Sequence, residues 1–391
     1  FTYGTNYEAL GRQTGKLAGR VLRGEKVKDV DAEYPKTLNV VVNHDMAKEL
    51  GIDVSSISDE ESKASTQDDK PIAKKDKGVI KLKVNKSSKK GFSNVVLTAI
   101  SQGLLWAIMA IGVFITFRIL DLADLTAEGA FPLGAATTTI MIIRGINPIF
   151  ATLGGFVAGM LAGAVSGFMH TKMKIPALLT GIITLTGLYS VNLLVLGSAN
   201  VSLSGHNTLV TMVMDLGLSK LNGVILLGLI FVSLVVLMLV VLLNTQVGLA
   251  LRATGDNLAM GEANGIKVDR MKILGYMISN GLIALSGALL AQNNGYADMN
   301  MGTGTIVNGL AAIILAEVIV KYLPLGKRLW SIVVGAVLYR LVLVIILAMN
   351  VDAQMLKLAS AILLAIILYV PEVRQKLKIK PNKSLTLGGD K

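Results

Sequence analysis

Long apolar stretches, interrupted by short polar loops, dominate the chain from residue 92 to residue 371. An apolar run of about 18 residues or more is long enough to cross a bilayer as a helix. Asp, Glu, Lys and Arg are all absent from the runs 145–171, 175–214, 221–251, 273–297 and 299–316. Apolar segments lie at about 95–117, 130–143, 148–169, 176–197, 222–243, 271–292, 306–321, 329–349 and 353–370. The pattern predicts an all-α polytopic membrane domain over 92–371.

The residues before this domain carry a different pattern. Residues 7–23 have the apolar spacing of an amphipathic helix, and Leu38–Val42 is a short β-rich run. They predict a small α/β-like fragment over residues 1–55, which is too short for a secure core of its own. Residues 56–91, rich in Ser, Asp and Lys, predict a charged disordered linker. At the other end, residues 372–391 form a basic tail, which we expect in the cytoplasm.

Composition supports the membrane interpretation and limits the chemistry. Charged residues make up 16% of the chain and the mean hydropathy is +0.61, whereas a soluble domain carries about 25% charge. A soluble enzyme is therefore excluded as the main body. With no Cys and three His, neither a disulfide framework nor a metal cluster is expected. The start at Phe1, without a Met or a signal peptide, indicates a fragment or a processed product.

The net charge of +12 is concentrated ahead of the first apolar segment, where nine Lys and one Asp lie between Lys70 and Lys90. In a soluble chain this balance would suggest a nucleic-acid partner. In a membrane protein the positive-inside rule explains it, because Lys-rich and Arg-rich loops stay in the cytoplasm. We therefore expect contact with membrane lipid, no nucleic acid, and a linker in the cytoplasm.

The same rule orients the remaining loops. The basic loops at 170–174, 252–272 and 321–328 are expected in the cytoplasm. The loops at 198–219 and 293–305 carry almost no Lys or Arg and are expected outside. These assignments agree with one another from residue 148 onward.

The second apolar segment breaks this alternation. With the Lys-rich linker inside, a full second span would place residues 144–147 on the wrong side of the membrane. We therefore predict that 121–143 is a re-entrant or broken helix, which leaves about eight transmembrane helices. Irregular backbone at membrane depth is tolerated only where protein or a water-filled cavity covers it. This places Glu128 and Gly129 near a translocation path.

Other polar residues within the apolar segments are further candidates for the path: Asn192, Asn280, Glu317 and Arg340. Ionisable groups within a bilayer are costly and are often functional. Structural roles are favoured for all of them. Glu317 lies one turn from Lys321 and is expected to pair at the cytoplasmic edge; Arg340 needs protein or water around it, and Glu317 is one possible partner. The two Asn side chains are expected to make packing hydrogen bonds.

Small residues repeat on the third apolar segment, where a glycine recurs every four residues: Gly155, Gly159, Gly163 and Gly167. This spacing lets helix backbones approach closely. Packing inside one subunit is the favoured interpretation, and a seam between two subunits is the alternative.

The loop after the fifth apolar segment has signals for a short helix. Asp256 is a suitable N-cap, and Gly265 is a suitable stop because glycine adopts the left-handed conformation cheaply. Between them, Leu258, Ala259 and Glu262 form a possible docking face. A capped helix on the cytoplasmic side suits mechanical contact with a partner, and an ordinary connecting loop is the alternative.

No stretch of the chain makes a nucleotide site. The segment Gly11–Lys16 resembles a phosphate-binding loop, but it has three residues between its glycines instead of four and is followed by Leu17. The chain is therefore expected to bind no cofactor, and any ATP belongs to another chain.

Several segments of the membrane domain resemble the permeases of the branched-chain amino acid/ribose ABC importer family: residues 121–136, 174–193, 248–292 and 309–320. The resemblance implies a coupling helix over Asp256–Ile266 that seats in a groove of a cytoplasmic ATPase. Its residues would include Asn257, Leu258, Met260, Glu262, Gly265 and Ile266. It also implies two permease subunits, identical or different, and two ATPases that bind the ATP. Hydrolysis would take place on those partners, and the permease itself would not be an enzyme.

Residues 3–54 resemble the C-terminal end of the ligand-binding lipoproteins of ABC importers, in the subgroup for tryptophan, tyrosine or related solutes. Together the two resemblances imply an amino acid permease in a bacterial cell membrane, served by an extracellular binding lipoprotein. An ion-coupled secondary transporter or channel is the alternative. A self-contained receptor–permease conflicts with a cytoplasmic linker, so residues 1–55 are expected to be a fusion remnant.

Overall fold

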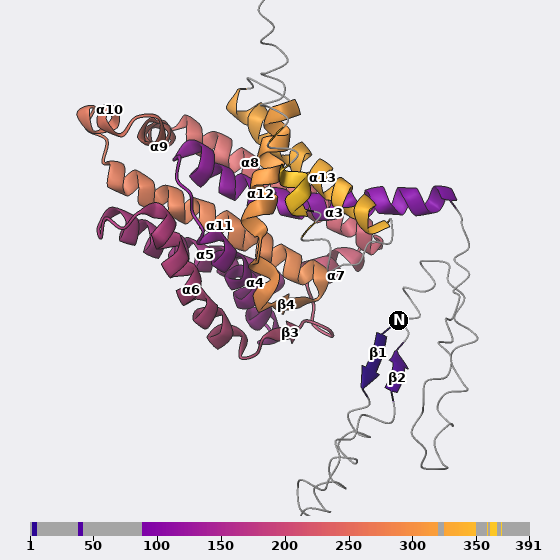
Figure 1. Cartoon of the computed structure of the whole chain (residues 1–391). Helices are drawn as coiled ribbons and strands as arrows, with labels where there is room; N and C mark the ends of the chain where they lie inside the picture. The colour runs from indigo at the N-terminus through magenta and orange to yellow at the C-terminus, as the bar shows by residue number, and fades with distance from the viewer. Residues whose placement is uncertain are drawn as a thin grey trace, which may run out of the picture. The chain divides into compact units, whose positions relative to one another are not determined.

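A computed structural model of the chain is mostly helical (Figure 1). It describes residues 2–5, 38–41, 88–319 and 324–348, together with 358, 360–365 and 369. The chain divides into two compact units, Phe1–Gly91 and Phe92–Lys391. The predicted helix at 7–23, most of the linker, most of the apolar segment at 353–370 and the tail at 372–391 lie outside the described residues.

The first unit contains a two-stranded antiparallel ladder. Strand β1 (Thr2–Thr5) pairs with β2 (Leu38–Val41), with Thr2 opposite Val41. The β-rich run that the sequence predicts at 38–42 therefore forms a strand.

The second unit is a bundle of apolar helices, and in the described part of the chain seven are long and apolar enough to cross a membrane. This confirms the all-α membrane fold. The long helices are α3 (Ser88–Phe114), extended by the π-helix η2 (Ile115–Ile119), α5 (Pro148–Thr171), α6 (Ala177–Leu196), α8 (Lys220–Asn244), α11 (Val268–Asn294), α12 (Thr305–Ile319) and α13 (Leu325–Ala348). The shorter elements are α4 (Ala127–Ile143), α7 (Leu209–Met214), α9 (Gln246–Asp256), α10 (Leu258–Ala263), β3 (Asn200–Ser202), β4 (Tyr296–Asp298) and η3 (Met299–Gly302).

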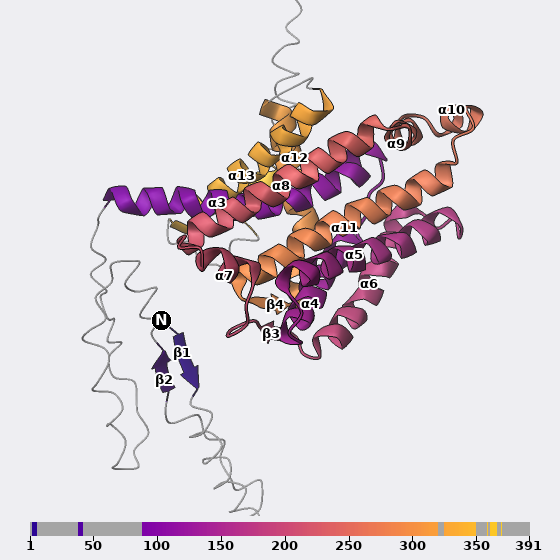
Figure 2. The ribbon, with the colours of Figure 1, turned by 180° about the vertical axis from the view of Figure 1, so that it is seen from behind.

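Helix α11 is the central element of the bundle. Tyr276, Leu282 and Ala284 on this helix are fully buried. It runs from α10 at one end to β4 at the other, and β4 pairs there with β3 (Figures 1 and 2). We call these the α10 end and the β3–β4 end. Large apolar side chains on α5, α6 and α8 remain exposed, including Phe150, Leu194 and Leu237, and are suited to contact with lipid.

The glycine repeat lets α5 lie directly on α11 and α4. A Cβ on Gly163 would overlap the carbonyl oxygen of Tyr276, and a Cβ on Gly159 would meet Ala284 and the carbonyl oxygen of Asn280. Gly167 faces Ile273 of α11 in the same way, and Gly155 faces Thr138 and Gly134 of α4. The glycine face therefore packs within one subunit.

Helix α4 is short and begins inside the bundle. The Thr126 hydroxyl lies 2.7 Å from that of Ser166, and the Thr138 hydroxyl donates to the carbonyl oxygen of Ala151 at 3.1 Å. Since residue numbers rise on α4 as they fall on α5, the two helices are antiparallel. The turn before α4 is not helical, although Asp124 and Thr126 are buried. This is the segment for which the sequence predicts a re-entrant or broken helix.

Helix α3 runs antiparallel to α11. Ser286 donates to the carbonyl oxygen of Leu105 and Ser279 to that of Gly112, both at 2.8 Å. Further along, the backbone of Ile119 touches Gly255 of α9. The N-terminus of α3 therefore lies away from the α10 end (Figures 1 and 2).

This direction corrects one prediction. The start of α3 lies at the opposite end of this helix from the loop at 252–272, about 40 Å away at 1.5 Å per residue, so α3 runs opposite to the direction that the sequence predicts. The loop at 144–147 does lie at the β3–β4 end as predicted. It reaches that end because α4 runs antiparallel to α5. The helix whose direction differs from the prediction is α3, not α4.

Candidate functional site

A polar cavity of about 210 Å³ lies between α4, α6 and the segment that follows β4. It is lined by Glu128, Gly129, Pro132, Leu185, Tyr189, Asn192, Met299, Asn300 and Thr303. Its volume lies below the roughly 300–1,000 Å³ typical of pockets for drug-sized ligands, so it suits a small solute. The structure thus brings three of the predicted path residues, Glu128, Gly129 and Asn192, to one site.

Asn192 connects the two helices that form the cavity. Its side chain is 1% exposed, and its Nδ2 donates to the carbonyl oxygen of Gly129 at 3.1 Å. The Oδ1 atom of the same amide is buried and accepts no hydrogen bond from the described residues. An unsatisfied buried polar atom costs about 1–3 kcal/mol. Asn192 therefore lines the cavity with an amide whose Oδ1 is buried and has no partner among the described residues.

Glu128 holds the third wall of the cavity in place. Its Oε1 accepts a hydrogen bond of 3.1 Å from the backbone N–H of Gly304. Gly302 packs on the carbonyl of Glu128 so closely that a Cβ would overlap it. The segment 299–304 is thus held against the first turn of α4. This segment forms one wall of the cavity. The sequence predicts only an outer loop at 293–305, so this role was missed.

The remaining path candidates lie elsewhere. The Nδ2 of Asn280 donates to the Asp124 carboxylate at 2.7 Å and to the carbonyl oxygen of Tyr276 at 3.0 Å, so this side chain joins the turn before α4 to α11. Glu317 forms ion pairs with Arg118 and with Arg328, the latter at 2.8 Å. Lys321, which the sequence suggests as the partner of Glu317, lies outside the described residues.

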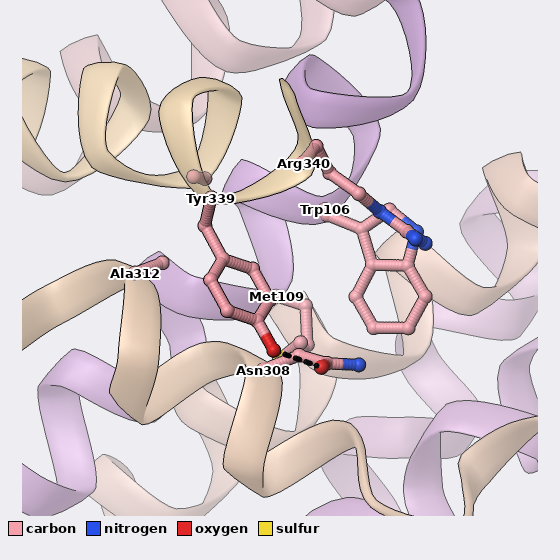
Figure 3. Close-up of a pocket in the computed structure, with 7 residues that line it drawn as sticks. Trp106, Met109, Asn308, Ala312, Tyr339 and Arg340 are labelled. Carbon is pink, nitrogen blue, oxygen red and sulfur yellow. Dashed lines mark hydrogen bonds between the residues drawn. The ribbon is translucent and has the colours of Figure 1, made fainter. Parts of the chain in front are cut away.

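Arg340 occupies a second, much smaller pocket, which Figure 3 shows. Its guanidinium lies 4.4 Å from the centre of the Trp106 ring, a cation–π contact. Beside it, the hydroxyl of Tyr339 donates to the Oδ1 of Asn308 at 3.0 Å. The pocket holds about 10 Å³, close to the space of a single water molecule. Pairing of Arg340 with Glu317 is therefore wrong, since Glu317 binds Arg118 and Arg328 at the α10 end.

Helix α10 projects from its end of the bundle (Figure 1). Leu258 and Met260 are 45% and 51% exposed, and Glu262 is exposed as well. Gly265 lies in the turn after α10 and has a φ of +78°, in the left-handed region that favours glycine. Ile266 donates its backbone N–H to the carbonyl of Gly261 at 3.0 Å.

The cap of this helix differs from the prediction. Asp256 is the last residue of α9, and Asn257 caps α10 by accepting a hydrogen bond of 3.1 Å from the N–H of Met260. The sequence favours both residues as caps. Only the course of α9, which continues as a helix to Asp256, decides between them.

We expect Asn257→Ala to destabilise α10 locally by about 1 kcal/mol, within the range of about 0.5–2 kcal/mol for a lost cap. Such a change increases the population of locally opened α10 by about fivefold, which hydrogen exchange of the 257–264 peptide measures. Asp256→Ala is the matched control and should leave this exchange unchanged. Equal effects of the two substitutions would contradict the assignment of the cap.

Comparison with known proteins identifies the family of the membrane unit. Residues 95–371 match the family described as branched-chain amino acid transport system, permease component. The chain belongs to this permease family. Residues 1–64 of the permease match a second family, described as ABC transporter substrate binding protein.

Individual relatives agree with this family. The permease is 38% identical over 293 residues to a tyrosine transport system permease protein of Clostridioides difficile, across 74% of this chain and 95% of that protein. It is 35% identical to an uncharacterised protein of Rickettsia prowazekii, across 70% and 96%. It is also 26% identical to an autoinducer 2 import system permease protein of Salmonella paratyphi B, across 55% and 60%.

Family membership and the seven candidate spans identify a transport subunit: a multi-pass membrane permease of an ABC importer. This confirms the predicted function class and the predicted location in the bacterial cell membrane. It also decides against an ion-coupled carrier or channel.

Proposed function

We propose that this permease carries an aromatic amino acid, or a related small solute, through the cavity between α4 and α6. A separate cytoplasmic ATPase binds α10 and hydrolyses the ATP, and two permease subunits form the path. The observation that carries the proposal is the cavity itself. It combines the amide of Asn192, whose buried Oδ1 a small movement of the side chain would open to a solute, with the carboxylate of Glu128 and apolar walls.

An amino acid suits the chemistry of this cavity. Its ammonium group is a donor and a cation, which complements the acceptor of Asn192 and the negative charge of Glu128. Leu185, Pro132 and the ring of Tyr189 offer apolar surface to a side chain of the solute. Identity of 38% to a tyrosine transport permease supports an aromatic side chain.

The helices provide a mechanical connection between α10 and the cavity. At Gly255, near the end of α9, the backbone touches Ile119 of η2, and a Cβ at this glycine would overlap the Ile119 carbonyl oxygen. The turn 120–126 follows η2 directly and leads into the first turn of α4, which carries Glu128. Movement of α9 and α10 by an ATPase would therefore reach the wall of the cavity through backbone contacts, which transmit displacement because they cannot be compressed.

We expect Asn192→Leu to reduce ATP-dependent uptake of labelled tyrosine at least about tenfold, which corresponds to about 1.4 kcal/mol. The substitution removes the acceptor and the hydrogen bond to Gly129, while membrane insertion should persist. Uptake is measured in cells that express the permease with its ATPase, and competition by other amino acids and sugars identifies the solute.

Leu194→Ala serves as the control, because this side chain on the same helix is 83% exposed. It should transport at the unmodified rate. Normal uptake by Asn192→Leu would refute the cavity as the path, and uptake driven by an ion gradient without an ATPase would refute the mechanism.

A further inference from the structure

The direction of α3 determines where the chain enters the membrane. Three contacts fix the direction of α3 and of η2, which continues it: Ser286 donates to the carbonyl oxygen of Leu105, Ser279 donates to that of Gly112, and Gly255 packs against Ile119 at the α10 end. A reversed α3 would lose all of these contacts. The chain therefore enters the bundle from the β3–β4 end.

The short loops assign the two ends to sides of the membrane. Nine Lys and Arg residues of the described chain lie at the α10 end: Arg118, Lys172, Lys174, Arg252, Lys267, Arg270, Lys272, Lys327 and Arg328. Four lie at the β3–β4 end: Arg144 and Lys220 beside the short loops, and Lys89 and Lys90 in the first turn of α3. By the positive-inside rule the α10 end is cytoplasmic. This agrees with the docking of an ATPase on α10, so the inference rests on the proposed function.

From these two observations we propose that residues 1–91 lie outside the cell membrane. The segment that matches ABC substrate-binding proteins, residues 1–64, then lies on the side from which an importer receives its solute. A receptor segment and the permease are thereby joined in one polypeptide on the receiving side.

The nine Lys of the linker argue against an external position, because Lys-rich segments favour the cytoplasm. The positive-inside rule counts charge in loops up to about 60 residues long and within about 15–20 residues of a span, so this cluster favours the cytoplasm; longer segments, however, cross the membrane largely regardless of charge. The linker is part of a segment of 91 residues, and the loops that assign the α10 end are short. The packing of α3 and the short loops therefore outweigh the Lys cluster. The objection that a receptor in the cytoplasm could not work no longer applies.

The absence of Cys from the chain makes a direct test possible. Three single-Cys variants, Ser62→Cys in the linker, Ser204→Cys in the β3–β4 end loop and Ala263→Cys on α10, are treated in intact spheroplasts with a membrane-impermeant maleimide. Ser204 and Ala263 are exposed. We expect Ser62→Cys and Ser204→Cys to be labelled at least tenfold more than Ala263→Cys. All three should label equally after detergent permeabilisation, which shows that each thiol is accessible.

The outcomes separate the inference from the proposed function. Protection of both Ser62→Cys and Ala263→Cys, with Ser204→Cys labelled, would overturn the inference and leave the permease mechanism intact. Labelling of Ala263→Cys in intact spheroplasts would place α10 outside and refute ATPase docking there. As a second measurement, protease added to intact spheroplasts should cleave the linker and release the N-terminal segment; an uncleaved chain would contradict the inference.

Discussion

Gly163→Val is expected to prevent α5 from lying on α11 and to cause a large loss of stability. A side chain at this position would overlap the carbonyl group of Tyr276 and approach the Cα of Met277. Overpacking costs about 1–3 kcal/mol where neighbouring side chains can move. Here the neighbour is the backbone of the central helix, so we expect about 3 kcal/mol or more, a decrease of about 6 °C or more in the melting temperature.

Thermal unfolding of the purified permease in detergent measures this effect, together with its abundance in the membrane. Gly187→Val is the matched control, because Gly187 also lies within a membrane helix but a Cβ there would have no neighbour within 4 Å. The control should unfold close to the unmodified temperature. A stable Gly163→Val variant would mean that α5 and α11 are not in backbone contact.

Loss of coupling is the second large effect that we expect. The double substitution Leu258→Glu and Met260→Glu places two charges on the exposed apolar face of α10, where these side chains are 45% and 51% exposed. Burying an unpaired charge in an interface is unfavourable. Uptake should therefore fall at least about tenfold, equal to a loss of about 1.4 kcal/mol in binding. The ATPase should no longer co-purify, and the abundance of the permease should not change.

An exposed apolar residue at the other end of the bundle supplies the comparison. Leu216 is 78% exposed in the loop after α7, and Leu216→Glu should leave both uptake and the ATPase complex intact. If the double variant on α10 transports normally and retains its ATPase, α10 is not the coupling element.

The two predictions address different parts of one mechanism. Gly163 tests whether the frame of α5 and α11 is rigid, while Leu258 and Met260 test whether force enters that frame at α10. Between them lie Gly255 and Ile119, whose backbones touch. A rigid frame with one projecting contact would transmit the action of an ATPase to the cavity without chemistry in the permease itself.

The hydrophobic pattern alone was sufficient for the class of protein and the position of most helices. A transmembrane helix needs about 20 apolar residues, and this requirement is local in sequence. The same is true of the left-handed turn at Gly265 and of the four-residue spacing that brings Gly163 to a helix interface. Each of these features depends on residues within a few positions of one another.

The tertiary structure was needed for every feature that joins distant segments. It showed that α3 enters from the β3–β4 end, because this direction depends on contacts of Gly112 with Ser279, 167 positions apart. It placed Glu128 and Asn192 in one cavity. It also showed that Glu317 forms ion pairs with Arg118 and Arg328 and not with Arg340. The linker showed the limit most clearly. Its Lys cluster predicts one side of the membrane, whereas the packing of α3 against α11 places the start of α3 at the β3–β4 end.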